Sequence, residues 1–298
     1  MRRYLFKEVD NYGFNKIVRE YLNYPSIFPL PFNMHHGWYV SERPRSSDLE
    51  NNSSIILVFN KRQADIWRKY SDKKVAILGA PFIHYRRKYG ILRSQNPKGM
   101  IVYPAHSGSN SDAVFNQREL CEDILKYSKQ YNPITVSVHH DDILRGKDKI
   151  YREYGFNVFC SGHRKSIEFA KNFYNEIRKY KIACSNNFGS QLLYAVEMGI
   201  PYFVFGPKVE LVKDETKGPV HSRKTDWENS FLNYIGRLFS KPLDSVTEDQ
   251  QRFVLKESGV DDAMDPSQLR SLLIKALFQN EIPNKFIRLT RKIIYFME

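Results

Sequence analysis

The stretch IACSNNFGSQLLYAVEMGIPYFVFG, residues 182–206, decides the fold. Its apolar runs and turn residues predict a strand over residues 181–184, a helix over residues 187–198 and a second strand over residues 202–205. Gly199 ends the helix, and Pro201 leads into the next strand. The segment is therefore one strand–helix–strand unit, which is the building block of a parallel sheet.

The start of this helix has the properties of a phosphate site. Gly189 and Ser190 open the helix after a loop of serine and asparagine residues that begins at Ser185. The first N–H groups of a helix lack partners within it and lie at the positive end of the helix dipole. Gly189 allows close approach to the backbone, and the hydroxyl groups of Ser185 and Ser190 are further donors. We predict that this loop, which includes Asn186, binds the phosphate of a ligand.

Strands and helices alternate upstream of this unit as well. His106, His139, His163 and Ser185 each follow closely on the end of a predicted strand. Because the carboxyl ends of parallel strands meet at one edge of a sheet, we expect these residues to border a binding crevice. The alternative interpretation is a set of ordinary solvent-facing loops. The other predicted elements are strands over residues 99–103, 134–138 and 157–160 and helices over residues 117–131, 147–154 and 166–180.

The first third of the chain repeats the rhythm on a smaller scale. Helices are predicted over residues 11–24 and 61–70, strands over residues 55–59 and 75–78, and a linker over residues 90–98. We expect a small α/β domain at residues 1–98, a second α/β domain at residues 99–235 and a helical segment at residues 236–298.

The last segment contains two predicted helices. Asp265 is the expected cap of the first, and Pro266 is its first residue. Residues 284–296 form an amphipathic pattern with a basic face. Two interpretations stay open for them: a packed terminal helix, or a helix that lies on an anionic membrane.

Composition excludes several classes of protein. The 298 residues are 42% hydrophobic and 27% charged, which excludes a disordered chain and a fibrous rod. The apolar runs are far shorter than the ~18 residues of a membrane span, and the first ten residues lack the apolar segment of a secretory signal. Cys121, Cys160 and Cys184 are isolated, which argues against a disulfide framework and a cysteine metal site. The cytoplasm is the expected compartment.

Positive charge is concentrated near the N-terminus. Residues 1–98 hold 18 Lys and Arg against 8 Asp and Glu, a balance of +10, whereas the other 200 residues contribute +3 of the total of +13. The excess predicts an anionic partner: a phosphorylated acceptor, an acidic membrane face or nucleic acid. Plain solubilising charge is the alternative. Arg86, Arg87 and Lys88 form one of the clusters expected to contact an acceptor or a membrane.

The central stretch resembles a known family. The order of a strand, Ser-x-x-x-Gly-Ser, a helix, Ala-x-x-x-Gly-x-Pro and a strand resembles the donor-binding half of GT-B glycosyltransferases over about residues 99–206. The resemblance implies two Rossmann-like domains that face a cleft, a donor phosphate at the helix start and a reaction without metal. Many of these enzymes bind the donor ribose through an acidic residue just before the Ala. Tyr194 stands there in this chain, and Glu197 is the nearest acidic candidate.

The resemblance extends upstream in the order of short motifs. His36-Gly37, Gly79-Ala80-Pro81, residues 104–107 and a histidine after the next strand are similar to the teichoic-acid glycerophosphotransferases, which use a CDP-linked donor. This resemblance implies that His36 is the catalytic base, with His35 as the neighbouring candidate. An imidazole titrates near neutrality, as the deprotonation of a hydroxyl acceptor requires. A structural histidine in an aromatic loop is the alternative.

These observations favour a cytoplasmic GT-B glycosyltransferase, with the inner face of the cytoplasmic membrane as a peripheral location. It would move a sugar from a nucleotide-sugar donor to a hydroxyl of a glycan or lipid-linked acceptor in bacterial surface polysaccharide synthesis, with no cofactor. The alternatives are a CDP- or CMP-linked transferase on the same fold, a GT-B scaffold without catalysis, and a basic nucleic-acid-binding protein, although no known nucleic-acid-binding motif is visible. The predicted donor-binding residues are His106, Ser107, Ser109, His139, His163, Ser185, Asn186, Gly189, Ser190 and Glu197.

Overall fold

A three-stranded parallel sheet organises the N-terminal part of the chain. The computed structural model describes residues 11–35, 37–44, 46–51, 53–108, 111–213 and 224–283. The strands β1 (Phe32–Met34), β2 (Ile55–Val58) and β3 (Lys74–Ile77) lie in the order β1-β2-β3. All four residues of β2 are buried, as expected of a central parallel strand that is covered on both faces.

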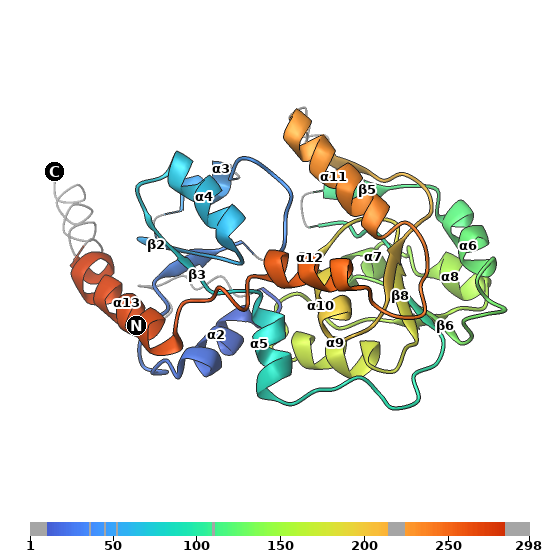
Figure 1. The fold of residues 1–298 in the computed structure, drawn as a ribbon, viewed down its shortest axis with the longest axis horizontal. Coiled ribbons are helices and arrows are strands. Elements are labelled where there is room, and N and C mark those ends of the chain that lie inside the picture. Colours follow the sequence, from blue (N-terminus) through green and yellow to red (C-terminus); the bar gives the residue numbers. More distant parts are fainter. Residues whose placement is uncertain are drawn as a thin grey trace.

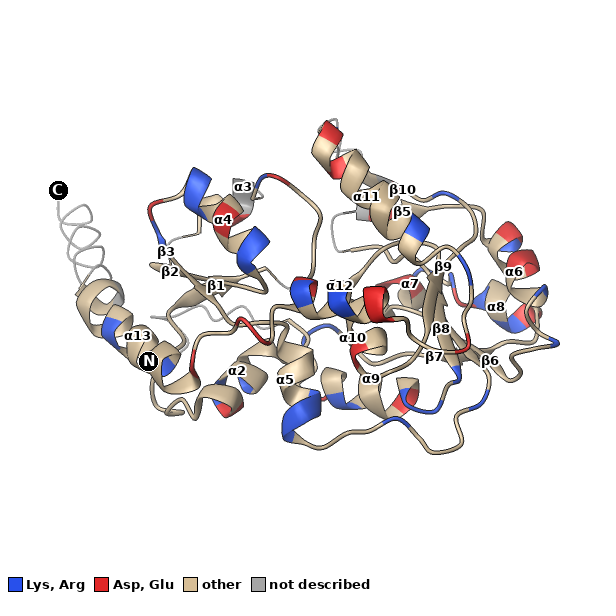
Figure 2. Ribbon diagram, viewed as in Figure 1, with Lys and Arg blue, Asp and Glu red and all other residues tan. Residues whose placement is uncertain are grey.

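Helices cover both faces of this first sheet. Helix α4 (Lys61–Tyr70) packs on Ile56 and Val58, and α2 (Phe14–Leu22) and α13 (Pro266–Ala276) pack on the opposite face. Asn60 caps α4 by accepting from the backbone N–H of Gln63. The other helices of this part are α3 (Ser46–Leu49) and α5 (Pro81–Lys88). Lys and Arg residues lie along α4 and at the C-terminal end of α5 (Figure 2).

A five-stranded parallel sheet forms the centre of the second part. Its strands lie in the order β7-β6-β4-β8-β9. The chain enters at the central strand, proceeds outward to β7, and then returns to the other side of β4 to form β8 and β9. The topological switch point therefore lies between β4 and β8, where open parallel sheets bind ligands. The strands are β4 (Met100–Tyr103), β6 (Ile134–Ser137), β7 (Asn157–Phe159), β8 (Ile182–Ser185) and β9 (Tyr202–Val204).

Two helical layers enclose the second sheet. Helices α6 (Gln117–Leu125) and α8 (Lys149–Glu153) cover one face, and α9 (Phe169–Ile177) and α10 (Ser190–Glu197) cover the other. A two-stranded antiparallel ribbon pairs β5 (Ser111–Val114) with β10 (Glu210–Lys213). The remaining elements are α7 (His140–Leu144), α11 (Asp226–Leu238), α12 (Glu248–Ser258) and a π-helical turn, Leu277–Glu281.

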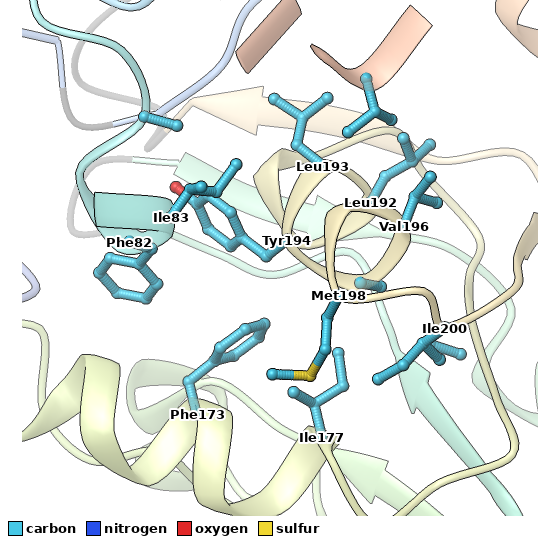
Figure 3. Packing of buried hydrophobic residues seen from close by; sticks show 14 of the residues in the cluster. Phe82, Ile83, Phe173, Ile177, Leu192, Leu193, Tyr194, Val196, Met198 and Ile200 are labelled. Atoms are coloured by element: carbon cyan, nitrogen blue, oxygen red, sulfur yellow. The ribbon is translucent and has the colours of Figure 1, made fainter. Parts of the chain in front are cut away.

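One hydrophobic core joins the two sheets. Phe82 of α5 stacks on Tyr194 of α10 with ring centroids 4.9 Å apart, and its ring also lies 5.8 Å from Phe173 of α9. Figure 3 shows these side chains facing one another. Helix α12 then runs between the two sheets, and α13 returns to the first (Figure 1). This cluster therefore packs the N-terminal and C-terminal parts against each other, while β2 and β3 bury their side chains in two further clusters.

The structure confirms an α/β fold with two parallel sheets, the first of them small, followed by C-terminal helices. This is the arrangement that the resemblance to GT-B enzymes predicts. Asp265 caps α13 and Pro266 begins it, as predicted. The division at residues 98 and 235 stays a prediction, and residues 284–296 lie outside the described part. Among the described residues, none of the helices combines the length and apolar character that a bilayer crossing needs.

Candidate functional site

The loops that follow β4 and β8 meet at the switch point. Asn186, one residue past β8, accepts a hydrogen bond from the backbone N–H of Ala105 through its Oδ1 at 2.7 Å. The Asn186 side chain is buried, with 7% of the residue exposed, and its Nδ2 has no hydrogen-bond partner among the described residues. A buried donor without a partner is costly to a fold. The switch point thus offers an N–H group suited to an oxygen acceptor.

Helix α10 begins without a capping side chain. Gly189 occupies the N-cap, and within the described residues no side chain accepts from the first turn of α10. Its φ of −162° is extended backbone that any residue adopts, so space rather than conformation favours glycine here. The Gln191 side-chain amide fills that space, where it would contact a Cβ at residue 189. The first N–H groups of α10, which no side chain caps within the described residues, are suited to an anion.

The loop that carries the candidate base rests on the start of α10. We call residues 35–39 the histidine loop. The backbone N–H of Trp38 donates to Ser190 Oγ at 2.8 Å, and a Cβ on Gly37 would lie 3.4 Å from the same oxygen. Ser190 therefore joins the two predicted halves of the site, which are 152 residues apart in the chain.

The two candidate bases differ in what the structure describes. Nδ1 of His35 lies 3.4 Å from Asp48 Oδ2, and its ring meets the Tyr39 ring edge-on at 4.7 Å. Such a carboxylate partner orients an imidazole. His36 lies outside the described residues, so the choice between the two histidines stays open.

Two histidines of the second sheet are brought together beside the switch point. His106, after β4, stacks on His139, after β6, with ring centroids 4.5 Å apart. Tyr12 from the N-terminal part lies against His139, its hydroxyl 3.4 Å from Nε2. Burial, followed by the nearby His106, lowers the pKa of His139 to about 4, so its ring is neutral at physiological pH.

His163 belongs to a different pair. Its ring meets His140 edge-on at 5.0 Å, and its Nδ1 accepts from the backbone N–H of Lys165. It follows β7, the edge strand, which β6 and β4 separate from β8. The structure therefore places His163 apart from the start of α10.

Two of the predicted donor-binding serines are buried and have partners inside the protein. Ser185 is fully buried, and its Oγ accepts from the backbone N–H of Asn187 at 3.0 Å. Ser107 is also fully buried, and its Oγ donates to Asp112 and accepts from Lys147 Nζ at 3.0 Å. Both hydroxyl groups shape the loops that carry the site. Ser109 lies outside the described residues.

Glu197 also has a partner inside the protein. It lies at the C-terminal end of α10, and both of its carboxylate oxygens accept from Arg86 at 2.7 Å. The side chains of Glu197 and Arg86 are 3% and 13% exposed, respectively, so this is a buried ion pair between α10 and α5. Glu197 therefore lies at the opposite end of α10 from Gly189, and Arg86 is unavailable to an acceptor or a membrane.

The two cations that follow Arg86 are more exposed and are also paired. Arg87 contacts Glu197 and Asp261, and Lys88 contacts Glu20. The cluster predicted as one anion-binding surface is thus largely a set of links between elements.

Sequence reasoning missed Trp38 and Tyr12. Each makes its site contact with a residue more than one hundred positions away, Ser190 and His139 respectively. The aromatic residues around the histidine loop were the available signal, but they do not say what the loop contacts. Among the described residues, no group of three His, Cys, Asp or Glu side chains is placed to hold a metal ion.

No protein-family model matches the sequence, and no curated protein matches it. Among solved structures, the chain is similar to a UDP-GlcNAc 2-epimerase from Neisseria meningitidis bound to UDP-GlcNAc, at 12% identity and a TM-score of 0.38 over 76% of this chain and 62% of that one. It is also similar to sucrose-phosphate synthase from Thermosynechococcus elongatus, at 14% identity and a TM-score of 0.31 over 78% and 60%.

A third similar structure is the wall teichoic acid polymerase TagF with CDPG, at 10% identity and a TM-score of 0.32 over 83% of this chain and 59% of that one. The chain spans about three fifths of the length of the solved structures that it matches.

Proposed function

We propose that this chain is a transferase that takes a sugar from a nucleotide-linked donor, binding the donor phosphate at the start of α10. The observation that carries the proposal is the contact between Trp38 N and Ser190 Oγ at 2.8 Å. It brings Trp38, three residues after His35, onto an uncapped helix start beside the switch point of a parallel sheet. Transfer of a sugar away from a phosphate leaving group requires a base and an anion site close to each other.

The chemistry follows from that arrangement. An acceptor hydroxyl attacks the anomeric carbon of the donor and loses its proton to the imidazole of His35 or His36. The bond between that carbon and the donor phosphate breaks, and the phosphate leaves with the bonding electrons. The N–H groups of α10 and the Asn186 amide would stabilise the negative charge that develops on the leaving phosphate.

The identity of the nucleotide is the finer part of the proposal. Tyr194 stands where the GT-B pattern has its ribose-binding acid, and its ring is packed against Phe82 in the core. Glu197 does not replace that acid, because it is paired with Arg86. A CDP- or CMP-linked donor is therefore kept as the second candidate, supported by the order of motifs around His36.

A nucleotide panel tests the proposal. Thermal unfolding would be followed with UDP, GDP, TDP, CDP and CMP at increasing concentration. One of them should raise Tm saturably, since a hundredfold excess over Kd stabilises a folded protein by about 2.7 kcal/mol. If all five leave Tm unchanged while a DNA oligonucleotide binds with strong salt dependence, the protein is a nucleic-acid binder instead.

We further propose that the acceptor is an anionic, lipid-linked glycan of a bacterial surface polysaccharide, met at the inner face of the cytoplasmic membrane. The +10 balance of residues 1–98 supports this, since one donor phosphate needs only a few cations. Sedimentation with anionic and neutral vesicles at rising salt tests it. Binding should be confined to anionic vesicles and weaken as salt screens the surface. Equal binding to neutral vesicles, or none to either, refutes it.

A further inference from the structure

A buried carboxylate, Glu257, contacts the histidine loop at the Trp38 side chain. Glu257, in the last turn of α12, is 2% exposed. Its Oε2 accepts from Trp38 Nε1 at 2.8 Å and from Arg62 Nη2 at 2.8 Å. Asn60 Nδ2 donates to the backbone carbonyl of Glu257 at 2.6 Å. The carboxylate thus accepts hydrogen bonds from two parts of the chain, the histidine loop and the start of α4.

Arg62 extends this contact to the next residue of the loop. It belongs to α4, its side chain is 14% exposed, and its Nη2 also donates to the backbone carbonyl of Tyr39 at 2.8 Å. The guanidinium lies over the Phe231 ring of α11 at 5.2 Å. An arginine held between a carboxylate and an aromatic face is fixed in one orientation, because its planar fork suits both partners.

The histidine loop is consequently held at three points. Ser190 holds the backbone N–H of Trp38, Glu257 holds its indole N–H, and Arg62 holds the carbonyl of Tyr39. These partners come from α10, α12 and α4. A buried ion pair adds little net stability because both charges lose their water. Its clearest consequence here is a single defined conformation for the loop.

We propose that Glu257 and Arg62 are positioning residues, which fix the histidine loop over the start of α10 so that its base faces the bound donor. The contacts of Trp38 and Tyr39 support the positioning of the loop, whereas the catalytic consequence rests on the proposed function. Within the described residues, the side-chain hydrogen bonds of Glu257 and Arg62 go to the histidine loop, to the start of α4 and to each other. Their loss should therefore lower turnover through misplacement of the base and leave the affinity for nucleotide unchanged.

Two variants and one control test the proposal. Glu257→Gln keeps an acceptor for the indole and removes the charge opposite Arg62. Trp38→Phe removes the indole donor, together with part of the ring's volume, and leaves the ion pair between Glu257 and Arg62 intact. It keeps the test available if Glu257→Gln does not fold. The control is Tyr180→Phe, which deletes a buried hydroxyl that donates to Thr135 at 2.7 Å, next to the amino ends of the second sheet's strands.

Three measurements would be compared among the variants. They are the Kd for UDP and CDP by calorimetry, nucleotide release from the matching nucleotide-sugar, and amide hydrogen exchange over residues 37–42. Both test variants should lose turnover by about 10²-fold, the cost of a misplacement near 1 Å, while Kd stays within about twofold. Exchange over residues 37–42 should quicken in both, and Tyr180→Phe should change none of the three.

The outcomes separate the two proposals. Unchanged exchange over residues 37–42 overturns the positioning role whatever the turnover, because this readout needs no substrate. Quickened exchange with turnover equal to that of the wild type overturns the catalytic consequence. A wild-type protein that binds neither nucleotide and releases none from any donor refutes the proposed function, and the exchange result then still decides whether Glu257 orders the loop.

Discussion

Replacement of Gly189 by valine tests the phosphate site most directly. The extended φ of −162° accepts a β-branched residue without strain, and the side chain that a Cβ would meet is the flexible Gln191 amide. The fold should therefore survive. Valine is a poorer N-cap than glycine, by about 1 kcal/mol. At 2–4 °C per kcal/mol, Tm should fall by about 3 °C.

The effect on binding should be larger than the effect on stability. The valine side chain would cover the first N–H groups of α10, whose interaction with an anion is worth up to about 2 kcal/mol, or about 30-fold in Kd. At a ligand concentration of 100 times the wild-type Kd, the nucleotide stabilises the wild type by about 2.7 kcal/mol and the variant by about 0.9 kcal/mol. The ligand-induced rise in Tm should therefore shrink from about 8 °C to about 3 °C.

Gly236→Val is the matched control for this comparison. Gly236 lies in α11, and a Cβ there would meet nothing within 4 Å. Its ligand-induced rise in Tm should equal that of the wild type. A folded Gly189→Val protein with an undiminished rise in Tm would refute the assignment of the phosphate to the start of α10.

Three further predictions follow from the site. Alanine at the catalytic histidine, His35 or His36, should lower kcat by about 10²–10⁴-fold with nucleotide affinity kept, and the histidine whose loss has no such effect is not the base. Burial, then the stacked neighbouring histidine, lowers the pKa of His139 to about 4 from 6.5, so the unfolded chain binds the extra proton between these values. The free energy of unfolding should therefore fall as pH drops through that window. Between pH 7 and pH 4, His139→Gln should lose about 3 kcal/mol less of this free energy than the wild type, as measured by urea titrations at the two pH values. Glu197→Gln should lower the free energy of unfolding by about 3–5 kcal/mol, because it leaves Arg86 buried without its carboxylate; weakened nucleotide binding by the folded variant would return Glu197 to the donor site.

Local sequence signals predicted the second sheet and the start of α10 well. A continuous apolar run such as Met100–Tyr103, bounded by turn residues, needs no distant partner to indicate a buried strand. The helix after Gly189 was predicted for the same reason, since its glycine, serine and apolar spacing are all local. The short strand β1 was missed because three prolines precede it and it has only three residues.

The partners of individual side chains could not be predicted in this way. Ser185 and Ser107 have the residue types of a phosphate loop, yet their burial depends on how neighbouring loops fold over them. Glu197 is the acidic residue nearest to the position, held by Tyr194, that binds the ribose in the GT-B pattern. Its position against Arg86 depends on the packing of α5, which belongs to the other sheet. A side-chain role that depends on two distant elements is not encoded in either one.

The two ends of α10 show why its start remains the strongest candidate for an anion site. At the C-terminal end, Arg86 and Arg87 pair with Glu197, and their positive charges interact favourably with the negative end of the helix dipole. At the N-terminal end, the first turn holds no acidic residue and no side chain caps it within the described residues. By contrast, α11 and α12 both begin with complete capping boxes, at Thr225 and Thr247. One end of α10 is thus neutralised inside the protein, whereas the other, beside the histidine loop, has partners to gain from a bound phosphate.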